Sequence, residues 1–328
     1  MPKLPLSVLD TVPVFAGAPV GRSLHEAVRL ARAVEGLGLR RYWVAEHHNT
    51  PTTATSSPAV LISQLAQATE VLRIGSGGVM LPNHAPLVVA EQFNTLSAFH
   101  PGRIDLGVGR APGADPETAR ALRRDQGADF GAQVEELLGY LEPGARGVVA
   151  VPPVENPAPM LILGSSESSA ELAGRLGLAY AFAHHIRPDL TERALSIYRD
   201  AFEPSARRFR PHAIVAGIAI VADTDERADE LFGPLRLGFL RPGGPFATTA
   251  QAAAHPCGEG ERARADARFG DQLIGGIRTV RDRLDDLVRR VRPDELMALT
   301  VVDGFADRLR SYELLARLVD ADVTARTA

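Results

Sequence analysis

Segments of strand length and segments with helical spacing alternate along the chain of 328 residues. The sequence predicts strands at 4–10, 41–46, 73–80, 103–110, 159–165, 179–185, 212–222 and 295–302. It predicts helices at 23–39, 58–71, 86–99, 116–141, 168–178, 190–202, 224–240, 279–291 and 305–319. Strands that alternate with helices form parallel sheets, and eight such units are typical of a (β/α)8 TIM barrel.

A doubly wound open sheet is the alternative arrangement. Against it, the first predicted strand is not followed by the G-x-G-x-x-G turn that opens many such sheets. The segment 241–275 interrupts the alternation after the seventh strand, because it is rich in glycine and alanine and longer than most connections. We predict a single domain over 1–328 with an irregular, lid-like insertion at 241–275. Ser23 and Glu26 also predict a capping box at the start of the first helix.

The composition argues against several classes of protein. With 45% hydrophobic residues, 23% charged residues and a net charge of −4, the chain carries no electrostatic footprint for nucleic acid. No apolar run reaches the roughly 18 residues expected of a membrane-spanning helix. Cys257 is the one cysteine, so an internal disulfide is excluded and a reducing compartment fits. We expect a cytoplasmic protein that binds neither nucleic acid nor membranes.

Polar residues follow several predicted strands, at the end of a barrel where active groups gather. Glu46, His47 and His48 follow the second strand, and His184 and His185 end the sixth. Neighbouring residues on a strand point to opposite faces, so at most one histidine of each pair faces inward while the strand persists. The pattern therefore favours an acid–base group or a polar cluster over a metal site, and we predict no metal.

Two further strand ends suggest an anion site. Ser165, Ser166 and Ser169 lie at the start of a predicted helix, and Arg110 ends the preceding strand. Free N–H groups at a helix start attract anions, and a guanidinium suits bidentate phosphate binding. The alternative is that the serines only cap the helix and Arg110 pairs with an acid.

Several of these stretches resemble one family. The similar stretches are YWVAEHH, RIGSGGVMLPNHAPLVVAEQFNTLSAFHPGRIDLGVGRAPG, LILGSSESSAELAGRLGLAYAFA and ADRLRSYELLA. They resemble the flavin-dependent, luciferase-like monooxygenases, most closely the single-chain, non-luminescent branch. The resemblance covers nearly the whole chain. It implies a TIM barrel with FMN at the carboxyl ends of its strands, and a reduced flavin that uses O2 to oxygenate a small organic substrate, an aldehyde or another compound.

The resemblance also implies a binding site for the cofactor. Arg110, Ser166 and Ser169, with Ser165 nearby, would bind the FMN phosphate. The isoalloxazine would lie against Gly77-Gly78, where the family often has a cis peptide that is not prolyl. On the residues alone, these two glycines form either a tight turn or a flat stretch of backbone beside a planar ligand.

His47 matches a histidine that lies near the reactive face of the flavin in luciferases. The resemblance therefore implies an acid–base or hydrogen-bonding role for His47, while Glu46 and His48 orient the mouth of the barrel. The alternative is that these three residues form a satisfied polar cluster. His48, His184 and His185 are candidates for the substrate pocket, and a core or capping role is the alternative for His184 and His185.

The resemblance extends to partners and has one departure. Gly109 replaces the cysteine that bacterial luciferase has beside its phosphate-binding arginine, so we expect no light emission. Because the chain has no nicotinamide-binding fingerprint, we expect a separate flavin reductase to supply reduced FMN. Relatives dimerise through the second and third helices, so a homodimer is expected. Apolar residues there, which could equally face the barrel, are Ala59, Leu61, Ile62, Leu65, Val88, Val89 and Phe93.

Three alternative functions remain open from the sequence. They are a deazaflavin-dependent oxidoreductase that transfers hydride without O2, a non-catalytic flavin-binding protein and a metal hydrolase. The sequence assigns no role to Asn83, His84, Asp303 or Cys257.

Overall fold

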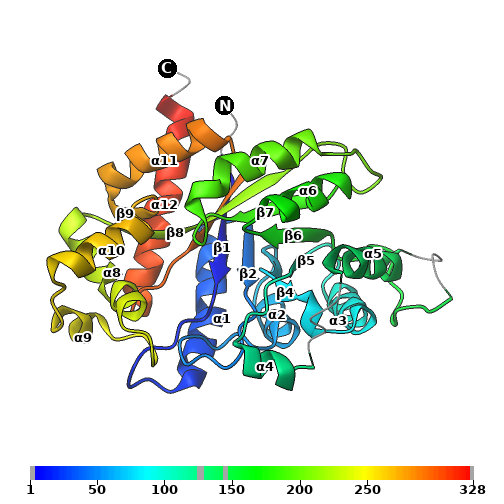
Figure 1. Cartoon of the computed structure of the whole chain (residues 1–328), viewed down its shortest axis with the longest axis horizontal. Coiled ribbons are helices and arrows are strands. Elements are labelled where there is room, and N and C mark those ends of the chain that lie inside the picture. The colour runs from blue at the N-terminus through cyan, green and yellow to red at the C-terminus, as the bar shows by residue number, and fades with distance from the viewer. Residues whose placement is uncertain (1–3, 124–128, 143–146, 326–328) are drawn as a thin grey trace.

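The computed structural model describes residues 4–123, 129–142 and 147–325. The barrel strands are β1 (Leu6–Asp10), β2 (Arg41–Val44), β3 (Arg73–Ser76), β5 (Ile104–Gly109), β6 (Met160–Gly164), β7 (Ala179–Ala183), β8 (Ala213–Ala222) and β10 (Glu295–Leu299). They are parallel, and β10 pairs with both β1 and β8, so the sheet closes on itself (Figure 1). The predicted TIM barrel is confirmed.

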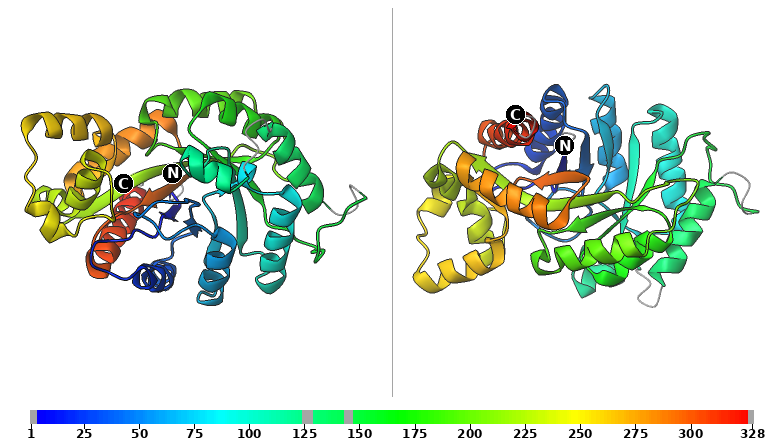
Figure 2. Two further views of the ribbon diagram at one scale, coloured as in Figure 1. Left: turned by 60° about the horizontal axis from the view of Figure 1, so that its bottom comes forward. Right: turned by 90° about the horizontal axis from the view of Figure 1, so that it is seen from above.

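Two short strands extend this sheet. β4 (Val79–Met80) continues beyond β3 and pairs with the end of β5, and β9 (Leu273–Gly276) pairs with the far half of β8. The helices are α1 (Val20–Gly36), α2 (Pro58–Gln67), α3 (Pro86–Phe99), α4 (Pro116–Ala121), α5 (Phe130–Leu141), α6 (Glu167–Arg175), α7 (Thr191–Asp200), α8 (Asp225–Leu240), α9 (Thr249–Ala253), α10 (Glu259–Phe269), α11 (Ile277–Val291) and α12 (Phe305–Ala325). Figure 2 shows helices around the outside of the strands.

Two predicted helices differ in detail. The helix predicted at 116–141 is α4 and α5, and residues 124–128 between them lie outside the described residues. α1 begins three residues earlier than predicted, at Val20, and Ser23 is a buried residue inside it. The predicted capping box is therefore wrong, because Pro19 occupies the N-cap with φ −67° and already has a backbone suited to start a helix.

The side chains of each strand alternate between two apolar layers. On β2, Tyr42 packs in the layer between the strands and the helices, whereas Trp43 packs inside the barrel with Leu9 and Met297. The barrel interior is therefore a packed core, and a ligand can enter only at its carboxyl end.

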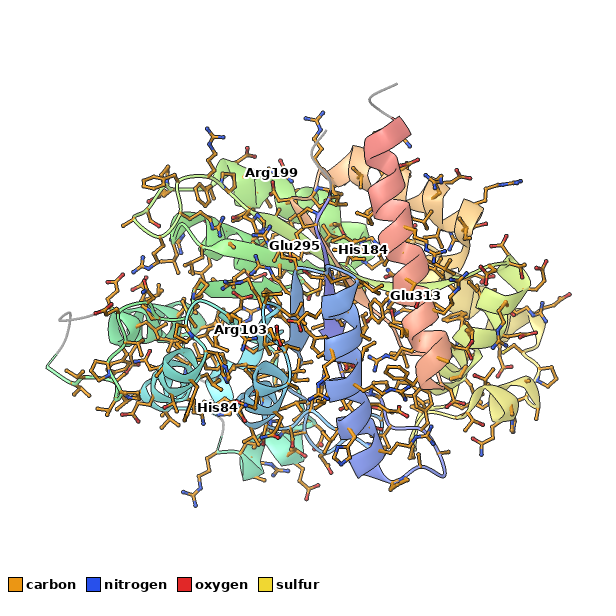
Figure 3. The ribbon with its side chains drawn as sticks, turned by 180° about the vertical axis from the view of Figure 1, so that it is seen from behind. His84, Arg103, His184, Arg199, Glu295 and Glu313 are labelled. Carbon is orange, nitrogen blue, oxygen red and sulfur yellow. The ribbon has the colours of Figure 1, made fainter. Side chains whose placement is uncertain are left out.

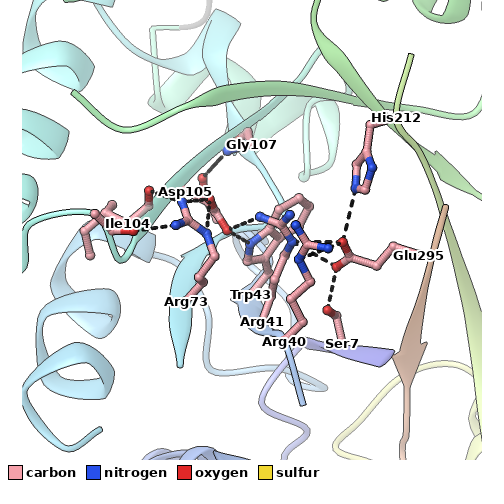
Figure 4. Close-up of polar contacts among 12 residues, drawn as sticks. Ser7, Arg40, Arg41, Trp43, Arg73, Ile104, Asp105, Gly107, His212 and Glu295 are labelled. Atoms are coloured by element: carbon pink, nitrogen blue, oxygen red, sulfur yellow. Dashed lines mark hydrogen bonds and ion pairs between the residues drawn. The ribbon is translucent and has the colours of Figure 1, made fainter. Parts of the chain in front are cut away.

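A buried ionic network lies at the amino end of the barrel (Figure 4). Arg41 donates from Nε to Glu295 at 2.9 Å and from Nη1 to Asp105 at 2.7 Å. Ser7 and His212 also donate to Glu295, at 2.5 and 3.2 Å. The network joins β10, β1, β2 and β5 across the interior, so it links strands that are far apart in the sequence.

The segment 241–275 is not irregular, which corrects the prediction. It contains α9, α10 and β9. Thr248 and Gln251 form a capping box that starts α9, and the alanines that suggested a lack of structure favour a helix instead. Phe269 of α10 packs against Phe232 and Phe239 of α8, with ring centroids 5.1 and 5.3 Å apart. The lid-like role of this segment stays a prediction.

Most of the apolar residues of α2 and α3 that were expected to form a dimer surface are not exposed. Leu61, Ile62, Leu65, Val89 and Phe93 are buried against the barrel. The exposed apolar residues of this region are Val60, Val71, Val88 and Phe99. The helical spacing alone left both faces possible, and closure of the barrel selects which face is buried. Among the described residues, no helix is long and apolar enough to cross a membrane.

We expect Glu295→Gln to lower the free energy of unfolding by about 3 kcal/mol, because the change leaves the buried Arg41 with one carboxylate fewer. Urea unfolding at pH 7 measures the effect. The matched control is Glu192→Gln, which removes an exposed ion pair with Arg290 and is expected to cost less than about 1 kcal/mol. Equal small effects of the two variants would contradict the role of the network.

The same comparison has an expected pH dependence. Burial alone would raise the pKa of Glu295, but the hydrogen bond from His212 and the charge of Arg41 outweigh it and lower the pKa from 4.5 to about 2. The folded carboxyl binds its proton more weakly than the unfolded one, so its contribution to stability is present above pH 4.5 and is lost as the pH falls towards 2. The difference between wild type and Glu295→Gln should narrow over that interval.

Candidate functional site

The loops after β2, β4 and β5 form one side of the barrel mouth. β2 ends at Val44, so His47 and His48 lie in a loop and the alternation of a strand no longer separates them. Both histidines line a pocket of about 430 Å³. The apolar wall of this pocket is formed by Leu235, Phe246, Leu299 and Val301.

Glu46 is a fully buried carboxylate at the centre of this side of the mouth. Its Oε1 accepts hydrogen bonds from the Nε2 atoms of His48 and His84, both at 2.9 Å, and from the amide of Asn83 at 3.2 Å. Its Oε2 accepts from the backbone N–H of Met80 at 3.0 Å. Because a carboxylate only accepts, each histidine carries a proton on the nitrogen that faces Glu46.

This arrangement sets the charge of Glu46. Burial would raise the pKa of the carboxyl, but the hydrogen bonds and charge of His84, with the bonds from His48 and Met80, lower it instead. The carboxylate is therefore ionised at neutral pH. Glu46 follows the carboxyl end of β2, whereas Glu295 begins β10, and Figure 3 shows His84 well apart from Glu295, so the barrel holds one buried carboxylate cluster near each end of its strands.

Asn83 and His84 had no predicted role, and both belong to this cluster. They lie directly after β4, in and after the short 3-10 helix Leu81–Asn83. A signal was present in the sequence, since the carboxyl ends of neighbouring parallel strands meet at one edge. Polar residues after the third strand are thus expected close to those after the second.

His47 lies beside this cluster but outside its hydrogen bonds. Its Nδ1 is buried and has no hydrogen-bond partner among the described residues. Burial lowers the pKa of His47, and the nearby His48 lowers it further, while the charge of Glu46 opposes the shift. The His47 ring is therefore neutral at pH 7, with one nitrogen that no protein group in the described part of the chain satisfies.

The wall formed by β3 and β5 has no room for side chains. The peptide bond between Gly77 and Gly78 is cis, as the resemblance implied. A Cβ atom added at Gly77 would lie 2.5 Å from Leu9 Cδ1, and one at Gly107 would lie 2.2 Å from the Ser76 carbonyl oxygen. Glycine is required at Gly107, where backbone occupies the space, whereas at Gly77 the obstacle is the end of the Leu9 side chain.

Arg110 and the three serines lie at adjacent strand ends. Gly109 of β5 pairs with Leu163 of β6, so the register brings Arg110 level with the residues just before Ser165 and Ser166. The Arg110 side chain is exposed at this end of the barrel.

The serines do cap α6, which was the alternative reading. Ser166 is the N-cap residue, and its Oγ accepts from the Ser169 N–H at 3.3 Å. The Ser169 hydroxyl donates to the Ser166 carbonyl at 2.8 Å and contacts the Tyr180 hydroxyl at 2.9 Å. Capping and ligand binding are compatible, because the N–H groups of the first helical turn have no acceptor within the helix.

His184 and His185 lie in the turn after β7, which ends at Ala183, and their side chains have different partners. His184 is 2% exposed, its Nε2 donates to the Asp271 carbonyl at 3.1 Å, and its Nδ1 contacts the Thr191 hydroxyl at 2.8 Å. This satisfied side chain fits the core role, so the assignment of His184 to the substrate pocket is corrected.

His185 lies directly after His184 at the carboxyl end of the barrel. Its Nδ1 donates to the Ala216 carbonyl at 2.8 Å. Burial lowers the pKa of His185 to about 4, and charges on Arg268 and His47 add to the shift, so the ring is neutral and lies within electrostatic range of both.

Asp303 and Cys257, to which the sequence assigned no role, lie near the start and after the end of α9. Asp303 accepts from the backbone N–H of Thr249 at 3.1 Å and so holds the start of α9. Cys257 is a half-buried free thiol between α9 and α10. Within the described ranges, no group of three or more His, Cys, Asp or Glu side chains is arranged to hold a metal ion.

Comparison with known proteins identifies the family. The model described as luciferase-like monooxygenase matches residues 5–294. An Escherichia coli K12 protein named luciferase-like monooxygenase is 41% identical over 319 residues, which cover 94% of this chain and 95% of that protein. Uncharacterized protein YvbT of Bacillus subtilis is 43% identical over 323 residues, or 95% of each chain.

A solved structure agrees with these sequences. The crystal structure of apo-MsnO8 superimposes with a TM-score of 0.91 at 35% identity and covers 97% of this chain and 98% of its own. The chain belongs to the luciferase-like monooxygenase family.

A double-mutant cycle tests the contact between Glu46 and His84. We expect Glu46→Gln and His84→Asn each to lower the free energy of unfolding by about 1–3 kcal/mol, because each leaves buried polar groups without a partner. The double variant should cost at least about 0.5 kcal/mol less than the sum. Urea unfolding gives the four values.

The control pairs Glu46→Gln with the distant Glu192→Gln, which should be additive within about 0.5 kcal/mol. Additivity in the His84 cycle as well would contradict a direct contribution from this contact.

Proposed function

We propose that the protein is an FMN-dependent monooxygenase that uses reduced FMN and O2 to oxygenate a small organic substrate. Three features at the same end of the barrel carry the proposal. They are the glycines of β3 and β5, the Arg110 guanidinium beside the start of α6, and the neutral His47 ring, whose Nδ1 has no hydrogen-bond partner among the described residues. Membership of the luciferase-like monooxygenase family supports it. Reduced FMN, when bound, supplies the electrons that activate O2.

The proposed phosphate site uses Arg110 and the start of α6. Arg110 offers a planar fork of N–H donors. The first turn of α6 adds backbone N–H groups and the positive end of the helix dipole. Ser166 and Ser169 keep that turn in place through their capping bonds, with Ser165 beside them. The donor set fits a dianionic phosphate.

The proposed ring site uses Gly77, Gly78 and Gly107. At Gly78 and Gly107 an added Cβ atom would lie 2.8 and 2.2 Å from backbone oxygen atoms of the neighbouring strand, so these strands approach closely and carry no side chains there. A surface without side chains is flat enough for a planar ring system to lie against it. This fits the isoalloxazine of a flavin.

His47 would then accept a proton or a hydrogen bond during the reaction. Its lowered pKa keeps the ring neutral at pH 7, so one nitrogen can accept a proton or a hydrogen bond from the reacting group. Glu46 is already engaged by His48 and His84, so it positions the loop that carries His47. His48 lines the same pocket and is proposed to contact the substrate.

We propose two partners, both from the family resemblance. A separate flavin reductase supplies reduced FMN. A second copy of the chain packs on the outer face of α2 and α3, where Val60, Val88 and Phe99 are exposed.

The segment 241–275 is proposed to shield the reaction from water. Phe246 lines the mouth pocket, and its backbone exchanges hydrogen bonds with Val14 and Ala16 from the loop after β1. The segment thus contacts the mouth beside the loop after β1. Excluding water is a common task of such segments in enzymes.

Titration of the purified protein with FMN, reduced FMN and reduced deazaflavin tests the proposed function. Tight binding of reduced FMN, followed by O2 consumption, is the expected result. Hydride transfer from reduced deazaflavin without O2 uptake would support the alternative oxidoreductase. Binding of flavin with no turnover of any substrate would support a non-catalytic flavin-binding protein.

Arg110→Ala is expected to weaken FMN binding by roughly 10- to 150-fold, because it removes a charge-assisted pair worth about 1.5–3 kcal/mol. Riboflavin has no phosphate, so its affinity should not change. Fluorescence titration measures both flavins. The control is Arg120→Ala on α4, an exposed arginine that should leave both affinities unchanged. Equal weakening of FMN and riboflavin would make Arg110 a structural residue.

His47→Asn should change the chemistry more than the binding. Asparagine keeps a polar group but cannot titrate near pH 7. We expect FMN affinity close to wild type and faster release of H2O2 when the reduced complex meets O2. A peroxide assay after rapid mixing measures this without a substrate. His255→Asn, at an exposed position, is the control. An unchanged rate of H2O2 release would exclude the role of His47.

A further inference from the structure

α10 is fixed above the barrel mouth by apolar contacts. Phe269, near its end, packs edge-on against Phe232 and Phe239 of α8. Phe269 and Ala265 belong to the same apolar cluster as Ala216 and Leu299 of the barrel interior. The residue before Phe269 is therefore held at a defined place next to the mouth.

That residue is Arg268, and its guanidinium points at the barrel. Nη2 donates to the carbonyl of His185 at 2.6 Å, just after the end of β7. Nη1 is buried and has no acceptor. Among the described residues, the His185 carbonyl is the one hydrogen-bond acceptor of this guanidinium, whose Cζ also lies 5.1 Å from the ring centroid of Phe269. Four of its five N–H donors are thus left for another partner.

Arg41 and Arg308 are buried more deeply than the half-buried Arg268, and each is paired with a carboxylate. Arg41 bonds to Asp105 and Glu295, and Arg308 bonds to Asp10 at 2.5 Å. A guanidinium that is partly removed from water without a counter-ion costs free energy. Burial accordingly lowers the pKa of Arg268, whereas the pKa of Arg308 is raised by its carboxylate despite burial. These surroundings suit an arginine that binds an anionic group of a ligand.

One face of α8 contacts both Phe269, the neighbour of Arg268, and the mouth pocket. Phe232, Leu235 and Phe239 are three and four residues apart and lie on one side of the helix. Phe232 and Phe239 hold Phe269, and Leu235 lines the mouth pocket beside Phe246. The His185 carbonyl that Arg268 binds lies just after β7, on the side of the closed barrel opposite β2, the strand that leads to His47.

We propose that Arg268 binds the anionic group, a carboxylate or sulfonate, of an amphiphilic substrate whose apolar part lies against Leu235 and Phe246. The donors for the anion are the remaining N–H groups of Arg268. The proposal rests on the proposed function only in taking the ligand to be the substrate. It narrows the substrate class to organic acids with an apolar chain.

Binding of hexanoate and hexanamide tests the proposal, because the two probes share an apolar chain and differ in charge. Isothermal titration calorimetry is run on the purified protein alone and with saturating FMN. Wild type should bind hexanoate at least about 10-fold more tightly than hexanamide. Arg268→Gln should abolish the difference, and Arg268→Lys should retain part of it because the charge remains. Thermal unfolding checks that each variant is folded.

Arg264→Gln is the matched control, since it removes the same charge from an exposed position of α10. It should keep the preference for hexanoate. Equal binding of both probes to wild type would overturn the proposal without any variant, and so would equal losses in Arg264→Gln and Arg268→Gln.

The anion could also be the phosphate of the cofactor, so FMN and riboflavin are titrated with the same variants. If Arg268→Gln weakens FMN but not riboflavin and leaves hexanoate unchanged, Arg268 belongs to the cofactor site and the proposal is wrong. None of these measurements requires turnover, so a failed oxygenase assay would leave the result on Arg268 interpretable.

Discussion

The pairing of β10 with β8 is the interaction on which the site depends, because it turns the sheet into a closed barrel. In an open sheet, the ends of β2 and β7 would lie far apart along one edge. In the barrel they face each other, so His47 and His185 lie within electrostatic range across one mouth. The apolar side chains inside the barrel support this closure and leave one end for a ligand.

Two buried carboxylates show how the barrel uses its two ends differently. Glu295, at the amino end, is paired with the permanently charged Arg41 and also accepts a hydrogen bond from His212. Glu46, at the carboxyl end, is held by the imidazoles of His48 and His84 and by backbone and amide N–H groups. Among the described residues, Glu46 therefore has no arginine partner, whereas Glu295 is paired with Arg41.

Periodicity and proline positions were enough to predict the barrel and many bounds of its elements. Helix α3 begins at Pro86 and ends at Phe99, as predicted, since proline favours the first helical turn. The N-cap of α1 was missed because Pro19 competes with the better-known Ser23 and Glu26 pattern. Local signals of this kind decide a boundary only when they do not conflict.

Long-range contacts could not be predicted in the same way. Arg41 and Glu295 are 254 residues apart, and no local pattern links them. Asn83 and His84 follow Glu46 by 37 and 38 residues, so their role appeared only when the strand ends were brought together. The alternation of β7 predicted that one of His184 and His185 faces inward, but the choice depends on the backbone after Ala183.

Several contacts between the barrel and the segment 241–275 use the backbone of the segment, beside the side-chain contacts of Arg268, Phe269 and Gln272. Asp303 binds the N–H of Thr249, His184 binds the carbonyl of Asp271, and Phe246 is held by main-chain bonds on both its N–H and its carbonyl. Every amino acid except proline supplies the same groups, so these attachments place few demands on side-chain identity. Residues of the segment that face the mouth can therefore change during evolution while these backbone contacts are kept. The same barrel can in this way acquire pockets for different substrates.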